Sequence, residues 1–166
     1  MPAADLVIRA LHLIAAAVWA GGLVFLALAV GAARRTLADA DRIAFLRAVG
    51  RRFAIVGAIA LLLLIVTGSD MTSDRDAWST LGEGTYGKTL LAKLILVAFV
   101  IVLTLVHSLI QGPALSRLRA RALARPDDSE LATRIRSRAA QAGVVSGLIL
   151  LATLAILVLA ARLVTG

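Results

Sequence analysis

Four ionisable side chains stand inside long apolar runs of this sequence, where a charged or imidazole group is costly. They are Arg9, His12, Lys93 and His107. The clearest case is His12, in the stretch LHLIAAAVWAGG. Within a membrane such a residue is by default a candidate functional site. An imidazole in an apolar setting is a good ligand for haem iron or for copper, so metal or cofactor binding is the chemistry to consider first.

The depth of each side chain decides which of them share a site. At a helical rise of 1.5 Å per residue, His12 lies about 9 Å and Lys93 about 6 Å below the outer ends of their runs. By the same arithmetic His107 lies about 27 Å down, near the opposite surface. We therefore predict that His12 and Lys93 face a common site and that His107 lies outside it.

Three states of this site are compatible with the residues: haem, copper or no occupant. Haem b would take His12 as an axial ligand, with Arg9 pairing with a propionate and the ring of Trp19 packing on the macrocycle. Copper would take His12 with Met71 and Asp70, and His107 would lie further along its path, although the chain has only two methionines. In the third alternative nothing binds, and His12 hydrogen-bonds a carbonyl group or water.

These side chains are positioned by four apolar runs, each of a length that fits a membrane-spanning helix. The runs are Leu6–Val30, Phe53–Gly68, Thr89–Ile110 and Ala139–Ala161. The chain is 60% hydrophobic, well above the value for soluble domains. We predict an all-α integral membrane protein, a single four-helix transmembrane bundle over residues 1–166. The expected helices span about 6–30, 41–69, 88–111 and 128–162.

Charge predicts the orientation of these helices. Most of the arginines lie between helices one and two or between helices three and four, whereas the loop between helices two and three is acidic. Short loops rich in Lys and Arg stay in the cytoplasm, so both termini are predicted to face outward. The net charge of +8 is then explained by topology and by anionic lipids at the cytoplasmic loops, and it does not indicate nucleic-acid binding.

Some classes of chemistry are not favoured. The chain has no cysteine, so disulfides, thiolate metal sites and thiol catalysis are excluded. It shows no Gly-rich phosphate loop, no paired intramembrane carboxylates and no Ser-His-Asp set, so a hydrolytic or phosphoryl-transfer enzyme is not expected. Small residues predict close helix contacts at Gly21 and Gly22 and at Gly143 and Gly147.

Three sequence blocks resemble the CopD (copper resistance D) domain of bacterial inner-membrane proteins. They are LHLIAAAVWAGGLVFLAL, RRFAIVGAIALLLLIVTGS and TYGKTLLAKLILVAFVIVL. The landmarks of the resemblance are His12, Trp19, Gly21, Gly22, Tyr86, Gly87, Lys88, Leu91 and Lys93. The likeness covers roughly residues 8–111 and implies a multi-pass protein of the bacterial inner membrane linked to copper handling. More distantly, the chain is similar to the HemJ-type protoporphyrinogen oxidases, whose helix-one histidine and helix-three lysine match His12 and Lys93.

The leading hypothesis is therefore a CopD-like inner-membrane protein with an outward-side cofactor site at His12 and Lys93. Haem b is the favoured occupant, serving electron transfer or metal handling. One alternative is a non-catalytic subunit that packs in a larger membrane complex or a homo-oligomer. Another is a transporter that moves a copper ion from His12 toward His107.

Overall fold

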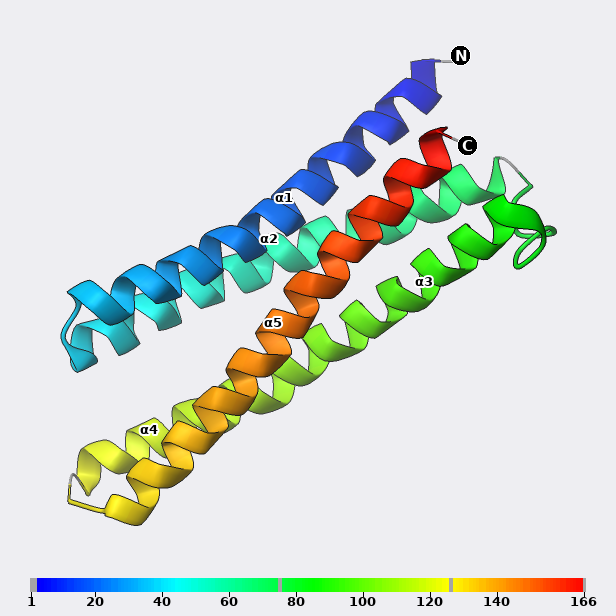
Figure 1. Cartoon of the computed structure of the whole chain (residues 1–166). Coiled ribbons are helices and arrows are strands. Elements are labelled where there is room, and N and C mark those ends of the chain that lie inside the picture. The colour runs from blue at the N-terminus through cyan, green and yellow to red at the C-terminus, as the bar shows by residue number, and fades with distance from the viewer. Residues whose placement is uncertain (1–2, 75, 126, 166) are drawn as a thin grey trace. The chain divides into compact units, whose positions relative to one another are not determined.

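The computed structural model describes residues 3–74, 76–125 and 127–165, and every regular element among them is helical. The elements are α1 (Ala3–Thr36), α2 (Asp39–Ser73), α3 (Gly84–Leu105), the π-helix η1 (Val106–Gln111), α4 (Gly112–Ala124) and α5 (Ser129–Thr165) (Figure 1). The predicted all-α fold class is confirmed.

Four helical stretches are long and apolar enough to cross a membrane, as predicted. They are Ala3–Thr36, Asp39–Ser73, Gly84–Ala122 and Ser129–Leu163. Each helix extends beyond the apolar run that indicated it. The 34 residues of α1 correspond to about 51 Å of helix, against a hydrocarbon thickness of about 30 Å. The helices therefore continue into their charged ends, where Ala, Leu and Arg still favour helix. The outward placement of both termini stays a prediction.

The chain forms two compact units, Met1–Glu83 and Gly84–Gly166, and each is described by itself. In the first unit α1 packs antiparallel along α2, and the two are joined by a short turn at Leu37 and Ala38 (Figure 1). Their interface includes Trp19, which is 5% exposed and packs on Phe53 with ring centroids 6.1 Å apart. The arrangement of all four helices as one domain stays a prediction.

In the second unit α3 packs on the antiparallel α5, and η1 and α4 also contact α5 (Figure 1). The helix α5 begins at Ser129. The carboxylate of the preceding residue, Asp128, accepts a hydrogen bond of 2.8 Å from the backbone N–H of Leu131. This side chain satisfies one of the N–H groups that a helix start leaves without an intrahelical partner. Gly143 and Gly147 were predicted to mark a close contact, but an added Cβ at either position would meet nothing within 4 Å.

The π-helix was not predicted, because hydropathy periodicity indicated a regular helix through this region. Its cause is Pro113, which stands in the first turn of α4 without a backbone N–H and would crowd the carbonyl group four residues before it. The widened turn accommodates the proline, and the N–H of Gly112 bonds the carbonyl oxygen of His107, five residues back.

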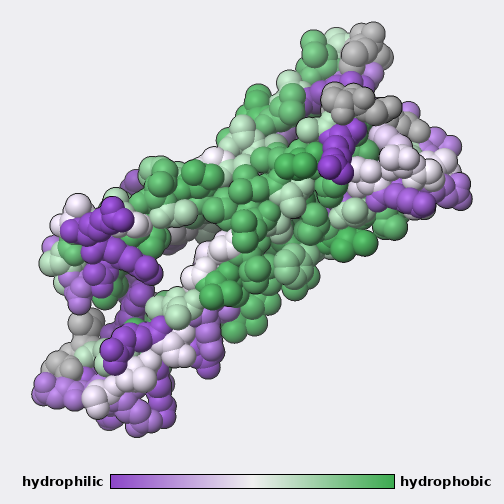
Figure 2. Space-filling view, in the orientation of Figure 1, coloured by the Kyte–Doolittle hydropathy of each residue, from purple (hydrophilic) through white to green (hydrophobic). Residues whose placement is uncertain are grey.

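Hydrophobic side chains cover the middle of the long helices, and hydrophilic side chains gather at their ends (Figure 2). Many large apolar residues are more than half exposed, among them Leu13, Phe25, Ile59 and Leu151. Water would penalise so much exposed apolar surface, whereas lipid acyl chains would not. Exposed apolar surface of this extent is typical of membrane-spanning helices.

Candidate functional site

His12 is held by a chain of hydrogen bonds that crosses from α1 to α2. Its Nδ1 lies 2.8 Å from the hydroxyl oxygen of Thr67, and that hydroxyl donates to the carbonyl oxygen of Leu63 at 2.5 Å. Because the Thr67 proton is used for Leu63, its oxygen can only accept from His12. This arrangement matches the neutral tautomer that is protonated at Nδ1, in which the lone pair is on Nε2.

The imidazole also packs closely against the backbone of α2. A Cβ placed on Gly68 would lie 3.3 Å from Cε1 of His12, which is tighter than most real contacts. Thr67 is 5% exposed, and His12 is partly buried. Glycine at position 68 and a short hydroxyl at position 67 thus fix both the position and the tautomer of one imidazole inside an apolar helix pair.

Met71 and Asp70 follow this point on α2. Met71 comes four residues after Thr67, so it lies on the same helix face about one turn nearer the outer end of α2. It is partly buried, whereas Asp70 is exposed. Arg9, about one turn before His12 on α1, is also exposed. The helix pair therefore brings one oriented imidazole and one thioether to the same face of α1 and α2.

Trp19 serves the packing of the first unit. Its ring contacts Phe53, and its Cζ3 atom would lie 3.2 Å from a Cβ added to Gly57. The structure thus gives this indole a position between α1 and α2. Its contact with a haem stays a prediction.

Lys93 lies on α3 and is partly buried. It belongs to the second unit, whereas His12 belongs to the first. The site that the two residues were expected to share stays a prediction.

The second unit contains a polar group of its own at the π-helix. The Nδ1 of His107 donates a hydrogen bond of 3.1 Å to the Oε1 of Gln111. One turn before it, the hydroxyl oxygen of Thr104 is buried and has no hydrogen-bond partner among the described residues. A bond to Gln111 from within its own helix gives His107 a local structural role, and its part in copper transport stays a prediction.

No group of three or more His, Cys, Asp and Glu side chains that could hold a metal ion occurs in the described part of the chain. A metal ion at His12 would therefore need ligands of another kind, such as the Met71 thioether. This is consistent with the chemistry of soft copper ions, which accept thioether as well as imidazole ligands.

Sequence reasoning did not single out Thr67 and Gly68. A signal was available, because VTGS is a small, polar interruption near the outer end of the second apolar run. In an antiparallel pair joined by a short turn, residues equally far from the turn lie opposite one another. Counting from the turn at Leu37 and Ala38 places position 63 opposite His12, one helical turn before Thr67, so the turn indicates the region of the partner but not the partner itself.

The four spans define a multi-pass membrane protein. A family model described as "CopD: Copper resistance protein D" matches residues 47–163. This match covers more than half of the 166 residues, so the chain belongs to the CopD family. No curated protein and no solved structure matches the chain. CopD is a family of bacterial membrane proteins, so the predicted location in the bacterial inner membrane is confirmed.

The matched range differs from the one on which the resemblance was based. It begins at Arg47 within α2 and includes α5, whereas the resemblance was placed over residues 8–111. The family assignment therefore does not depend on α1 or on His12. It makes this chain a copper-resistance-related membrane protein.

Proposed function

We propose that this protein binds copper as its cargo at the outer end of the α1–α2 pair, with His12 as the nitrogen ligand. The observation that carries the proposal is the hydrogen-bond chain from His12 through Thr67 to Leu63. Ligating histidines usually donate their other ring N–H to a neighbouring acceptor, which fixes the ring and raises its basicity. The Thr67 hydroxyl oxygen is such an acceptor.

Met71 is the proposed second ligand. Its thioether stands one turn beyond Thr67 on the same face of α2, and soft thioether ligands favour Cu(I). A site with so few protein ligands suits a cargo that must be released again, because fewer ligands hold an ion less tightly. Membership of the CopD family supports copper as the ion.

Haem b with an electron-transfer role is the second candidate for the same imidazole. The tautomer proposed for copper binding, with the lone pair on Nε2, would equally serve as an axial ligand of haem iron. Under this alternative Arg9 would pair with a propionate. The family membership concerns copper and adds no support for haem.

Metal analysis of the purified protein tests the proposal. The detergent-solubilised chain, loaded with Cu(I) under reducing conditions and then desalted, is expected to retain about one copper ion, the stoichiometry of one His–Met site. X-ray absorption should show nitrogen and sulfur scatterers. Protein that retains no copper would contradict the proposal. A Soret band that shifts on reduction, in protein expressed with ample haem, would support haem instead.

Replacing Thr67 with valine should weaken copper binding about 10–100-fold, the usual cost of removing the partner that orients a metal ligand. Valine keeps the shape of threonine but cannot accept the Nδ1–H of His12. Thr72→Val is the matched control, because Thr72 is also buried and bonds the carbonyl of Gly68 within its own helix. A competition titration with a chromophoric Cu(I) chelator measures both variants. Equal affinities in the two variants would contradict an orienting role for Thr67.

A further inference from the structure

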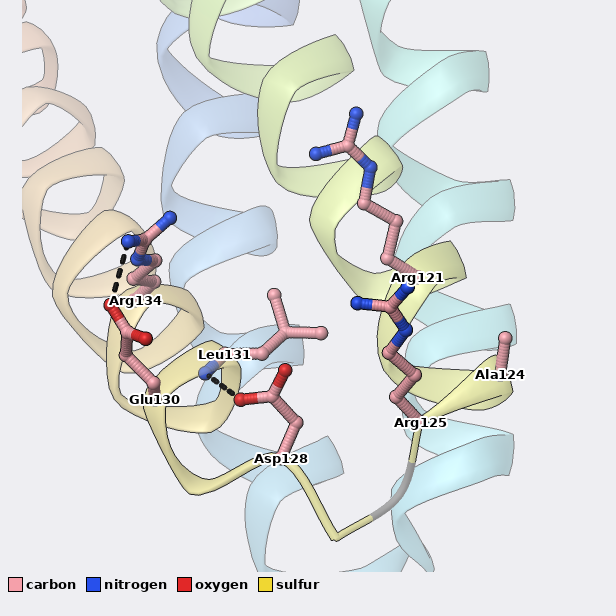
Figure 3. Close-up of a pocket in the computed structure, with 7 residues that line it drawn as sticks. All are labelled: Arg121, Ala124, Arg125, Asp128, Glu130, Leu131 and Arg134. Atoms are coloured by element: carbon pink, nitrogen blue, oxygen red, sulfur yellow. Dashed lines mark hydrogen bonds and ion pairs between the residues drawn. The ribbon is translucent and has the colours of Figure 1, made fainter.

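A cavity of about 490 Å³ lies where α4 meets the first turn of α5. Three arginines and two carboxylates dominate its lining (Figure 3). The lining residues are Arg121, Ala124, Arg125, Asp128, Glu130, Leu131 and Arg134. All of them belong to the second unit, so the cavity is complete within it and does not involve His12.

The two carboxylates are already occupied. Glu130 pairs with Arg134 at 2.6 Å, and Asp128 accepts the N–H of Leu131 as the cap of α5. In the described part of the chain, neither Arg121 nor Arg125 takes part in an ion pair. The lining therefore has a net charge of +1, with these two arginines on its α4 side.

Both arginines line the cavity from its α4 side. Arg121 lies in the last turn of α4, and Arg125 is the residue that follows the helix as its C-cap. Both side chains leave α4 on the side that faces the start of α5 and extend away from the loop, toward the membrane-spanning part of the helix (Figure 3). The start of α5 adds the partial positive charge of a helix N-terminus on the opposite side.

We propose that this cavity binds a phosphate group, with Arg121 and Arg125 as its ligands. Planar guanidinium groups bind phosphate oxygens through paired, charge-assisted hydrogen bonds. The capped, ion-paired carboxylates leave these two arginines as the groups available to an anion. The phosphate can come from an anionic lipid headgroup or from a small soluble phosphate, and the chemistry at the arginines is the same.

The position of the cavity along the chain favours the lipid source. The apolar run of the membrane-spanning stretch Gly84–Ala122 ends at Ile110, so Arg121 and Arg125 follow it by about 16 and 22 Å of helix, beyond the headgroup layer, with side chains that extend back toward the membrane (Figure 3). The positive-inside rule predicts the cytoplasmic leaflet for this loop, which is the leaflet that carries anionic lipid. Basic pockets between helices on that side are known binding places for phosphorylated headgroups.

The test compares lipid retention by the purified full-length protein and two double variants. Native mass spectrometry in neutral detergent would count bound phosphatidylglycerol, phosphatidylcholine and inorganic phosphate. The variant Arg121→Gln/Arg125→Gln should bind phosphatidylglycerol about 30-fold more weakly than wild type, as expected for two lost charge contacts at a membrane surface. The control Arg136→Gln/Arg138→Gln removes the same charge from exposed positions of α5 outside the cavity.

Each outcome decides the proposal. Selective loss in the cavity variant, with phosphatidylglycerol preferred over phosphatidylcholine, supports a lipid headgroup site. Selective loss of inorganic phosphate, without any preference among lipids, supports the same arginines as a site for a soluble phosphate. Equal loss in both double variants would show that net charge alone attracts anions, and this would overturn the proposal. Circular dichroism melting of each variant checks that the helices remain folded.

Discussion

The His12→Ala variant is expected to lose copper binding by more than the 10–100-fold cost typical of removing an outer-shell partner. The reason is that alanine removes the ligand itself, whereas Thr67→Val removes only the hydroxyl group that orients the His12 ring. A chelator competition titration on purified protein measures the affinity directly. Cells that carry His12→Ala should also differ from wild type in their response to added copper.

His107→Ala is the matched control for this experiment. His107 is the chain's other histidine, and its Nδ1 bonds Gln111 within the same continuous helical stretch. The copper affinity of its variant should stay near the wild-type value. If His12→Ala bound copper as tightly as wild type, His12 would not be the ligand. If both variants lost binding to the same degree, a path that needs both histidines would replace the single site.

Gly22→Ala should destabilise the α1–α2 pair by about 1–3 kcal/mol, the usual cost of overpacking a closely packed contact. A Cβ at position 22 would overlap the ring of Phe53. That ring in turn packs on Trp19, so it cannot shift without disturbing the centre of the helix pair. The free energy of unfolding, measured by denaturing-detergent titration followed by tryptophan fluorescence, is the relevant quantity.

Gly21→Ala supplies a control that differs by a single position. An added Cβ at Gly21 meets nothing within 4 Å. Alanine should then stabilise the helix by up to about 1 kcal/mol, because it has a higher helix propensity than glycine. The two substitutions are therefore predicted to have opposite signs. A loss of stability in Gly21→Ala comparable with that in Gly22→Ala would show that the Phe53 contact is not what decides the effect.

Sequence-based prediction succeeded for properties that depend on nearby residues. The four spans follow from hydropathy. The unusual character of His12 follows from its apolar surroundings, and the copper family was indicated by sequence blocks before the family match supported it. The π-helix at Val106–Gln111 was missed even though Pro113 is visible in the sequence. A proline shows that the helix must adapt, but it does not show whether a kink, a break or a widened turn results.

What the sequence by itself determined is therefore the all-helical membrane architecture, the number of spans and the residues worth testing. The tertiary structure alone decided that Thr67 orients His12, that Gly68 clears room for its ring and that Gly22, unlike Gly21, faces Phe53. The physical reason is that lipid is as apolar as a helix interface. Both faces of a membrane helix can thus be hydrophobic, and periodicity does not reveal which face meets its neighbour. That choice depends on how side chains from two helices fit together, which only their packing shows.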